Sequence, residues 1–431
     1  MDYNLPAADR YFKWLALFLP ISSFLLIPSV QGTTIGYFLA FFLFVFVAMF
    51  KGVRSKFYID FIKLSLVFGF ITVAAQWILG ARSYVSLDGL RLVDETLYPV
   101  MMRSSMITQS IYLIPCFLLM VFVKNFYNEK WDKYAFRGAI LISIYGIYEF
   151  LYFFIFKDNG DFISNRTFGD GSHEGSLFQT YTVAGMALQR IKSLTGEPSM
   201  FALTILPFWI YSMHLKRKFL SIFFFVVLVL SNSTTAFLGI GMYFLLYIRY
   251  NFQSIFKMYF VVLFGFIGCL FIGFNKIILF FQTNFGAKLS AQNVSGAERT
   301  MYMHQHLEYF MDMPFMSKLF GLGFGYARST DFFSTILVNT GIIGTILFTL
   351  LFLYPVFKLG YSDKEISLKC SLIVLYVAMM ISVPEFSYLS IWLFLGIAYY
   401  YVDKVKKKQR EEEKEREKRM LDFYINKGKV S

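Results

Sequence analysis

Cysteine, histidine and charged residues are all scarce in this chain. Its 431 residues include three cysteines and four histidines, and 16% of them are charged, against about 25% in a soluble domain. Cys116, Cys269 and Cys370 lie far apart within apolar stretches, which favours buried apolar residues over a disulfide framework or a metal cluster. With 54 phenylalanines and 57% hydrophobic residues, the chain could not keep its surface in water. A soluble globular protein is therefore excluded.

Long apolar runs are abundant, and they predict membrane-spanning helices. Each crossing needs about 20 apolar residues, and hydropathy predicts about twelve spans. They are expected near residues 11–29, 34–50, 57–80, 107–123, 134–156, 198–215, 219–231, 233–248, 258–280, 333–357, 368–384 and 387–402. The predicted fold class is thus an all-α polytopic membrane protein. Residues 1–402 should form one membrane-embedded helical domain, followed by a charged cytoplasmic tail at 403–431.

The distribution of lysine and arginine predicts the orientation, because short cytoplasmic loops carry an excess of both. Alternate short connections are basic, namely 51–56, 124–133, 216–218, 249–257 and 358–369. The intervening connections contain no Lys or Arg: 30–33, 231–235 and 384–387. All the basic loops fall on the side of the tail, so both termini are expected in the cytoplasm. Topology thus accounts for much of the net charge of +13, and a tail of mixed charge is typical of a helix near an anionic leaflet rather than of a nucleic-acid binder.

Two long polar loops, about 157–197 and 281–332, are then expected on the outer side. The first ends with Arg190 and Lys192, followed by Gly196-Glu197-Pro198-Ser199. Proline suits the first turn of a helix, and an acidic residue suits its positive end. Glu197 is therefore either a helix cap or a reactive carboxylate, and Arg190 either reaches a lipid phosphate or belongs to a site. Arg166, in the same loop, is expected to be merely solvated.

The second loop predicts a helix near 296–311, because Ser295-Gly-Ala-Glu298 has the spacing of a capping box. At 100° per residue, Arg299, Met303, His306 and Phe310 share one face, whereas His304 points elsewhere. Arg299 and His306 could therefore address one pocket.

A glycine-rich segment follows this helix. Gly321-Leu-Gly323-Phe-Gly325 would let backbone approach a ligand closely, and Arg328 offers another cation. The spacing does not fit a dinucleotide fingerprint.

One acidic residue lies deep in a predicted span. Glu149 is about 10 Å from the outer end of its span, at 1.5 Å per residue. Such a charge is costly unless it faces the protein interior or a cavity. Glu149 is therefore either a structural hydrogen-bonding group or part of a substrate cavity.

The chain resembles the O-antigen ligase and polymerase superfamily, and most closely its Wzy-type polysaccharide polymerases. The resemblance rests on four stretches in the same order: Arg190 to Ser199, Leu230 to Ala236, the helix of Arg299, and Gly321 to Gly325 followed by Asn339 to Gly344. Together they cover about residues 185–345. The histidine-to-glycine motif of the ligase branch is not intact around His304 or His306.

The resemblance implies an enzyme in the bacterial inner membrane that needs no metal and no cofactor. It would transfer a growing glycan from undecaprenyl pyrophosphate to a lipid-linked repeat unit on the outer face, for O-antigen, capsule or exopolysaccharide synthesis. The partners implied are lipid-linked glycans, membrane lipids and a chain-length regulator, with no nucleic acid. An O-antigen ligase and a lipid-linked oligosaccharide transporter remain the alternatives.

The residues predicted to carry the chemistry fall into two groups. Arg190 and Arg299 should stabilise the leaving pyrophosphate, because arginine binds phosphate bidentately and stays charged. Glu197 and His306 are the two candidates for the base that accepts the proton of the incoming hydroxyl. Substrate binding is assigned to Lys192, Arg328, Gly323 and Glu149.

Overall fold

The computed structural model describes most of the chain. It covers residues 6–82, 85–94, 96, 98–166, 168, 178–183, 185–250 and 294–428. The span predicted at 258–280 and the first part of the second loop lie outside the described residues.

Helices dominate the described part of the chain, and most of their bounds follow the apolar runs. The first helix, however, ends at Phe18, although the first span was expected at 11–29. They are α1 (Pro6–Phe18), α2 (Ile35–Ala48), α3 (Arg54–Gly80), α4 (Ser104–Phe126), α5 (Trp131–Phe156), α6 (Pro198–His214), α7 (Lys218–Leu230), α8 (Thr234–Tyr250), α12 (Val294–Asp312), α13 (Phe315–Phe320), α14 (Phe332–Lys358), α15 (Asp363–Ile381) and α16 (Leu389–Gly428). Four of the described helices, α3, α4, α5 and α14, are long and apolar enough to cross a membrane, and α2 and α7 are shorter apolar helices. The chain is therefore a mainly helical protein of membrane character, whereas the number of twelve spans stays a prediction.

The centre of the bundle is built around α6. Nearly every side chain of α6 is buried, as expected for a helix that is apolar all round. It packs against α15, α7 and α8, while α16 packs along α4. The core is rich in aromatic contacts, such as the stacked rings of Phe12 and Trp131 at 4.0 Å.

Two features correct the sequence prediction. The first long loop contains a two-stranded antiparallel hairpin, β1 (Thr180–Val183) and β2 (Met186–Gln189), where no strand was expected. The connection between α3 and α4, at 81–103, is a third long polar segment, although only two were expected. It joins the second loop through a bridge between Leu92 and Ala327. Arg103 holds this connection together, because its buried guanidinium pairs with Asp94.

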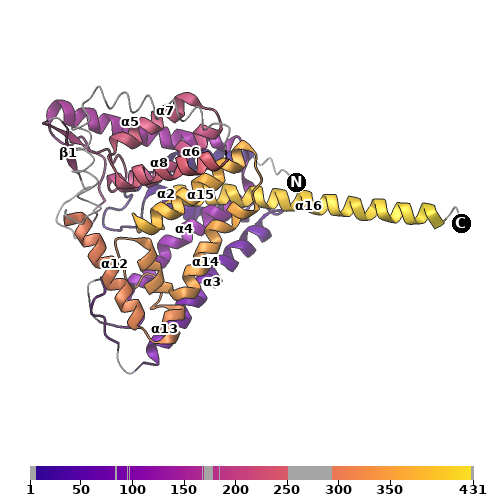
Figure 1. The fold of residues 1–431 in the computed structure, drawn as a ribbon, viewed down its shortest axis with the longest axis horizontal. Coiled ribbons are helices and arrows are strands. Elements are labelled where there is room, and N and C mark those ends of the chain that lie inside the picture. Colours follow the sequence, from indigo (N-terminus) through magenta and orange to yellow (C-terminus); the bar gives the residue numbers. More distant parts are fainter. Residues whose placement is uncertain are drawn as a thin grey trace.

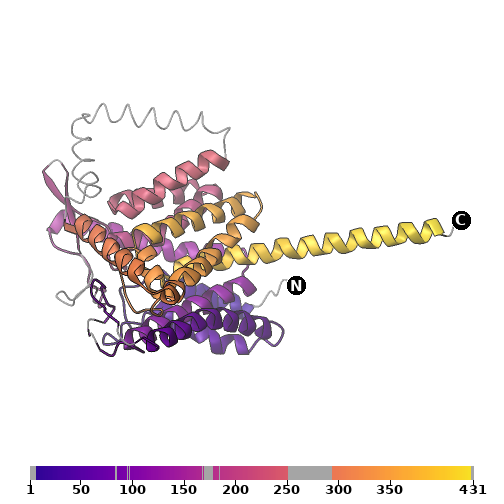
Figure 2. The ribbon, with the colours of Figure 1, turned by 60° about the horizontal axis from the view of Figure 1, so that its bottom comes forward.

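Helix α16 continues without a break past residue 402. Figure 1 shows its charged half leaving the body as a single helix, at the end opposite β1 and α12. Figure 2 shows the same protruding half of α16 from another side. The predicted tail is thus a direct extension of the last apolar helix.

Helix α14 is interrupted at Gly341, whose φ of 65° is not helical. The glycine-rich segment 321–325 packs against this interruption. The N–H groups of Leu322 and Gly323 donate to the carbonyl oxygens of Val338 and Asn339, at 3.0 and 2.7 Å. An added Cβ on Gly321 would lie 2.4 Å from the backbone of Asn339. The glycines therefore allow a close approach of backbone to α14, rather than to an open cavity.

Candidate functional site

Arg190 follows directly after strand β2. Its Nε donates to the carbonyl oxygen of Ser231 at 3.2 Å, and its Nη1 donates to Gln179 Oε1. Burial lowers the pKa of Arg190 to about 10; Glu197 opposes this effect, and the charge of Arg299 adds to it. The guanidinium therefore lies within electrostatic reach of Glu197 and Arg299, which are the two residues that the sequence assigned to the same site.

Glu197 occupies the N-cap position of α6, with Pro198 at the first helical position. Its side chain makes no capping hydrogen bond; instead, its Oε1 accepts a hydrogen bond from Ser199 Oγ. The simple capping alternative for Glu197 is therefore not realised. Its carboxylate contributes instead to the electrostatic field around Arg190.

Helix α12 confirms the helix predicted at 296–311. Along the predicted face, His306 and Phe310 are buried and Arg299 is half-buried, but Met303 is exposed. His304 points away as expected, and pairs with Glu308 on the surface at 3.2 Å. Arg299 lies close to the segment before α14, because its carbonyl oxygen accepts from Thr330 Oγ1 at 3.4 Å.

His306 is turned into the protein. Its Nε2 accepts the backbone N–H of Arg91 at 3.2 Å, and its Nδ1 has no hydrogen-bond partner among the described residues. Burial lowers the pKa of His306 to about 4; Asp331 opposes this shift, and Arg91 adds to it. The imidazole is thus neutral at physiological pH, and its accepting nitrogen already has a donor, which favours a structural role over proton transfer.

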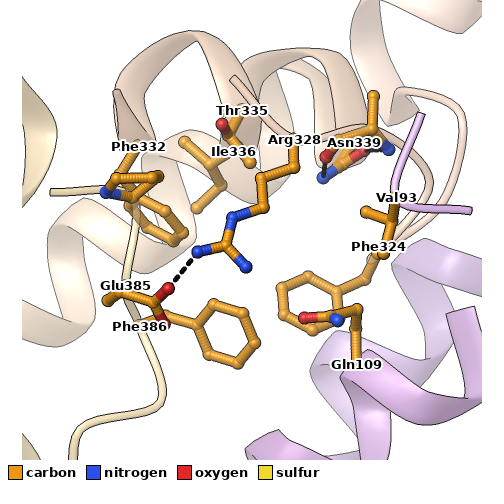
Figure 3. A pocket seen from close by; sticks show the side chains of 13 residues that line it. Val93, Gln109, Phe324, Arg328, Phe332, Thr335, Ile336, Asn339, Glu385 and Phe386 are labelled. Carbon is orange, nitrogen blue, oxygen red and sulfur yellow. Dashed lines mark hydrogen bonds and ion pairs between the residues drawn. The ribbon is translucent and has the colours of Figure 1, made fainter. Parts of the chain in front are cut away.

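Arg328 lies in a small pocket between the glycine-rich segment, α14 and the connection from α15 to α16. Figure 3 shows its guanidinium directed at the carboxylate of Glu385, between the rings of Phe332 and Phe386. Glu385 raises the pKa of Arg328 against the opposing effect of burial, and Glu197 adds to the rise. The pocket volume of about 20 Å³ is room for about one water molecule. The ion pair of Arg328 and Glu385 therefore forms part of the wall of this pocket, and the side chain of Arg328 stays partly exposed.

Lys192 and Glu149 are paired with each other. The Nζ of Lys192 lies 3.2 Å from Oε1 of Glu149 and also contacts Asp161, and all three side chains are buried. The other oxygen of Glu149 accepts the N–H of Ser193 at 2.8 Å. Burial alone would raise the pKa of Asp161, but Lys192 lowers it well below its usual range. The trio anchors the segment that leads from Arg190 to Glu197, which favours the structural alternative for Glu149.

Gly323 also lies against protein. A Cβ placed there would meet Met106 Cε at 2.4 Å and Gln76 Nε2 at 3.1 Å. Gln76 donates to the carbonyl oxygen of Leu322 and accepts the N–H of Met102. The glycine-rich segment is therefore fixed to α3, and Gln76 of α3 links it to the 81–103 connection.

The expectation that Arg166 is merely solvated in its loop is wrong, because its guanidinium contacts other parts of the protein. Its Nη1 donates to the carbonyl oxygen of Ser22 at 3.0 Å, and its Nε donates to Gln31 Oε1 at 3.2 Å. Its guanidinium also lies 4.9 Å from the ring centre of Phe168. Arg166 thus ties the first loop to the connection between α1 and α2.

The sequence did not single out Glu385 or Arg91 as residues near the candidate site. The connection 384–387 was used only for its lack of Lys and Arg, because the orientation rule does not count carboxylates. The length of the 81–103 connection was the signal that could have revealed Arg91. Among the described residues, no group of three or more His, Cys, Asp or Glu side chains could hold a metal ion.

Comparison with known proteins does not assign the chain to a family. No family model matches the chain, and neither a curated protein nor a solved structure matches it.

Proposed function

We propose that this protein is a polysaccharide polymerase of the bacterial inner membrane. It would transfer a growing glycan from undecaprenyl pyrophosphate to a lipid-linked repeat unit on the outer face, with both termini in the cytoplasm. The observation that carries the proposal is that Arg190, fixed by Ser231 and Gln179, lies within electrostatic reach of Glu197 at the start of α6 and of Arg299 from the other loop. Cations from two separate loops and one carboxylate thus share one electrostatic environment.

The reaction proposed for this cluster is a single displacement at the anomeric carbon of the donor sugar. The acceptor hydroxyl oxygen attacks that carbon and loses its proton to a base, while the bond to the pyrophosphate oxygen breaks. Negative charge develops on the departing pyrophosphate, and guanidinium groups fixed in advance stabilise it. Arg190 and Arg299 would supply this charge, and Arg328 would assist once a substrate phosphate replaces Glu385 as its partner.

Glu197 is the better base of the two candidates. It lies in the field of Arg190 and Arg328, and its side chain is only partly buried. His306, in contrast, is fully buried, and its Nε2 is engaged by the backbone of Arg91. Glu197 is therefore proposed as the base that accepts the proton of the acceptor hydroxyl. His306 is proposed to hold the 81–103 connection against α12.

The surface glycan of a strain that lacks the gene tests the proposal. A polymerase predicts that each acceptor carries a single repeat, and that the normal ladder returns when the gene is restored. Long glycan that stays on its lipid carrier would instead indicate a ligase. Accumulation of precursor on the cytoplasmic face would indicate a transporter, and either of these results would refute the polymerase.

A further inference from the structure

A large open cleft lies where the charged half of α16 leaves the body. Its walls come from the start of α3, the end of α4, the first turn of α15 and residues 400–411 of α16. Its volume is about 1170 Å³, at least as large as cavities that hold small ligands, which measure about 300–1,000 Å³. The proposed polymerase site uses none of these residues.

Positive charge dominates the lining of this cleft. Seven lysines and arginines line it, against three carboxylates. Asp403 is the central carboxylate, with an oxygen 3.3 Å from Lys56 Nζ and 3.7 Å from Lys124 Nζ. Lys124 is also held by Asp60 at 2.9 Å. The acidic groups thus fix the lysines of α3 and α4 in place without neutralising the cleft.

Lys406 and Arg410 supply cations from α16. They follow Asp403 at three and seven positions, a spacing that places all three residues on one helical face. The Nζ of Lys406 lies 5.2 Å from the ring centre of Tyr354. Neither residue forms an ion pair with another part of the chain that the structure describes. Their charge is therefore available to an anion.

The position of these residues matches the depth of lipid phosphates. The apolar section of α16 ends at Val402, so Lys406 and Arg410 lie about 6–12 Å beyond it at 1.5 Å per residue. The headgroup layer is about 5–8 Å thick on each side, and electrostatic attraction extends about 8 Å further at physiological salt. Figure 2 shows that the rest of α16 continues away from the body.

We propose that this cleft binds the phosphate headgroup of an anionic phospholipid from the adjacent leaflet. Lys406 and Arg410 contact the phosphate from one side, and Lys56 and Lys124 contact it from the other. Arginine offers a bidentate fork to phosphate oxygens, and lysine offers a point charge. Val405, which also lines the cleft and is only partly buried, offers the lipid an apolar contact.

Lipid binding to the full-length protein in neutral detergent tests this site. The probes are a fluorescent short-chain phosphatidylglycerol and the corresponding phosphatidylcholine. We expect phosphatidylglycerol to bind more tightly, and to weaken as salt is raised. The double variant Lys406→Gln/Arg410→Gln should bind it about 30-fold more weakly, since each cation near an anionic lipid surface contributes about 1 kcal/mol.

The matched control is Lys414→Gln/Lys418→Gln, which removes two cations at the same spacing further along α16. Its affinity should stay within about twofold of the wild type, since these residues lie beyond the headgroup layer. Equal binding of the two lipids, or an equal loss in both double variants, would overturn the proposal. Inorganic phosphate that competes at the same concentration as the lipid would show a site for free phosphate, and would also overturn it.

A variant that should raise the affinity for phosphatidylglycerol provides a second test. Asp403→Asn removes the carboxylate that Lys56 and Lys124 share, so it should tighten phosphatidylglycerol binding by about fivefold. Unchanged or weaker binding, in a variant that melts at the wild-type temperature, would contradict the proposed ligands. All of these readouts are independent of glycan synthesis, so the lipid site and the polymerase can fail separately.

Discussion

The guanidinium group of Arg190 is partly buried and lies within the electrostatic field of Arg299, although the two residues belong to different long loops. Burial, and then the charge of Arg299, lower the pKa of Arg190 to about 10, with Glu197 acting in the opposite direction. Two like charges within electrostatic reach of each other are costly, and the carboxylate of Glu197 offsets part of this cost. A pyrophosphate group would relieve that cost.

Substitution of either arginine should therefore remove polymer formation. Arg190→Ala and Arg299→Ala should each lower the polymerisation rate by about 10²–10³, the usual cost of losing a group that stabilises a transition state. Lysine should rescue poorly, because it lacks the bidentate fork. The measurement is the glycan ladder at equal protein level. Arg54→Ala, an exposed arginine at the start of α3, is the control and should leave the ladder intact; normal ladders from both site variants would refute the site.

The proposed orientation makes a labelling prediction. A cysteine at Asn159, which is exposed after α5, should react with an impermeant thiol reagent added to intact cells. A cysteine at Ser55, exposed at the start of α3, should react only after the membrane is opened. The wild-type chain, with its three native cysteines, is labelled in parallel to give the background; the two cysteines that the structure describes, Cys116 and Cys370, are buried. The reverse pattern would place the arginine cluster on the cytoplasmic side.

His306 should make stability, rather than activity, dependent on pH. Burial lowers the pKa of His306 to about 4, whereas the unfolded value is about 6.5. The unfolded chain therefore binds an extra proton between these values. The free energy of unfolding is therefore highest above about pH 6.5. It decreases as the pH falls towards 4, by roughly 3 kcal/mol at most.

Thermal melting of the purified protein measures this effect. His306→Gln, which can still accept the N–H of Arg91, should melt with a shallower dependence on pH between about 6.5 and 4. Its polymerisation rate should keep the wild-type pH profile. A rate that loses its pH dependence in this variant would restore His306 as the base.

The buried trio around Lys192 predicts a large difference between two lysine variants. Lys192→Met leaves the carboxylates of Glu149 and Asp161 buried without their cation, which costs about 3–5 kcal/mol. Lys216 also lies close to a carboxylate, 3.1 Å from Asp363, but both of these side chains are exposed. Lys216→Met should thus change stability little. Similar melting temperatures for the two variants would show that the buried trio is not an anchor.

The interruption of α14 predicts that one glycine is indispensable. At Gly341, φ is 65°, and an added Cβ would lie 2.4 Å from the backbone of Leu319. Gly341→Ala should cost at least about 1–2 kcal/mol, the penalty for a left-handed backbone conformation alone. Gly69→Ala in α3 is the control, because no atom lies within 4 Å of its added Cβ, and alanine favours a helix by about 1 kcal/mol. Opposite shifts in melting temperature are expected.

Local pattern alone predicted the membrane character, most described helix bounds and helix α12. Apolar runs and helical spacing are properties of neighbouring residues, and these elements depend on little else. The hairpin β1–β2 escaped prediction because its short strands sit within a polar loop. The length of the 81–103 connection could be read from the sequence, but its partner at Ala327 could not.

The arrangement of the charges was decided only by the tertiary structure. The sequence placed Arg190 and Glu197 in one long loop and Arg299 in the other, but it assigned Glu149 and Lys192 to substrate and gave Glu385 no role. In the fold, Lys192 meets Glu149 and Arg328 meets Glu385, across 43 and 57 positions of the chain. Ion pairs of this kind follow no sequence period, because they form wherever packing brings two distant segments together and leaves a charge to be compensated.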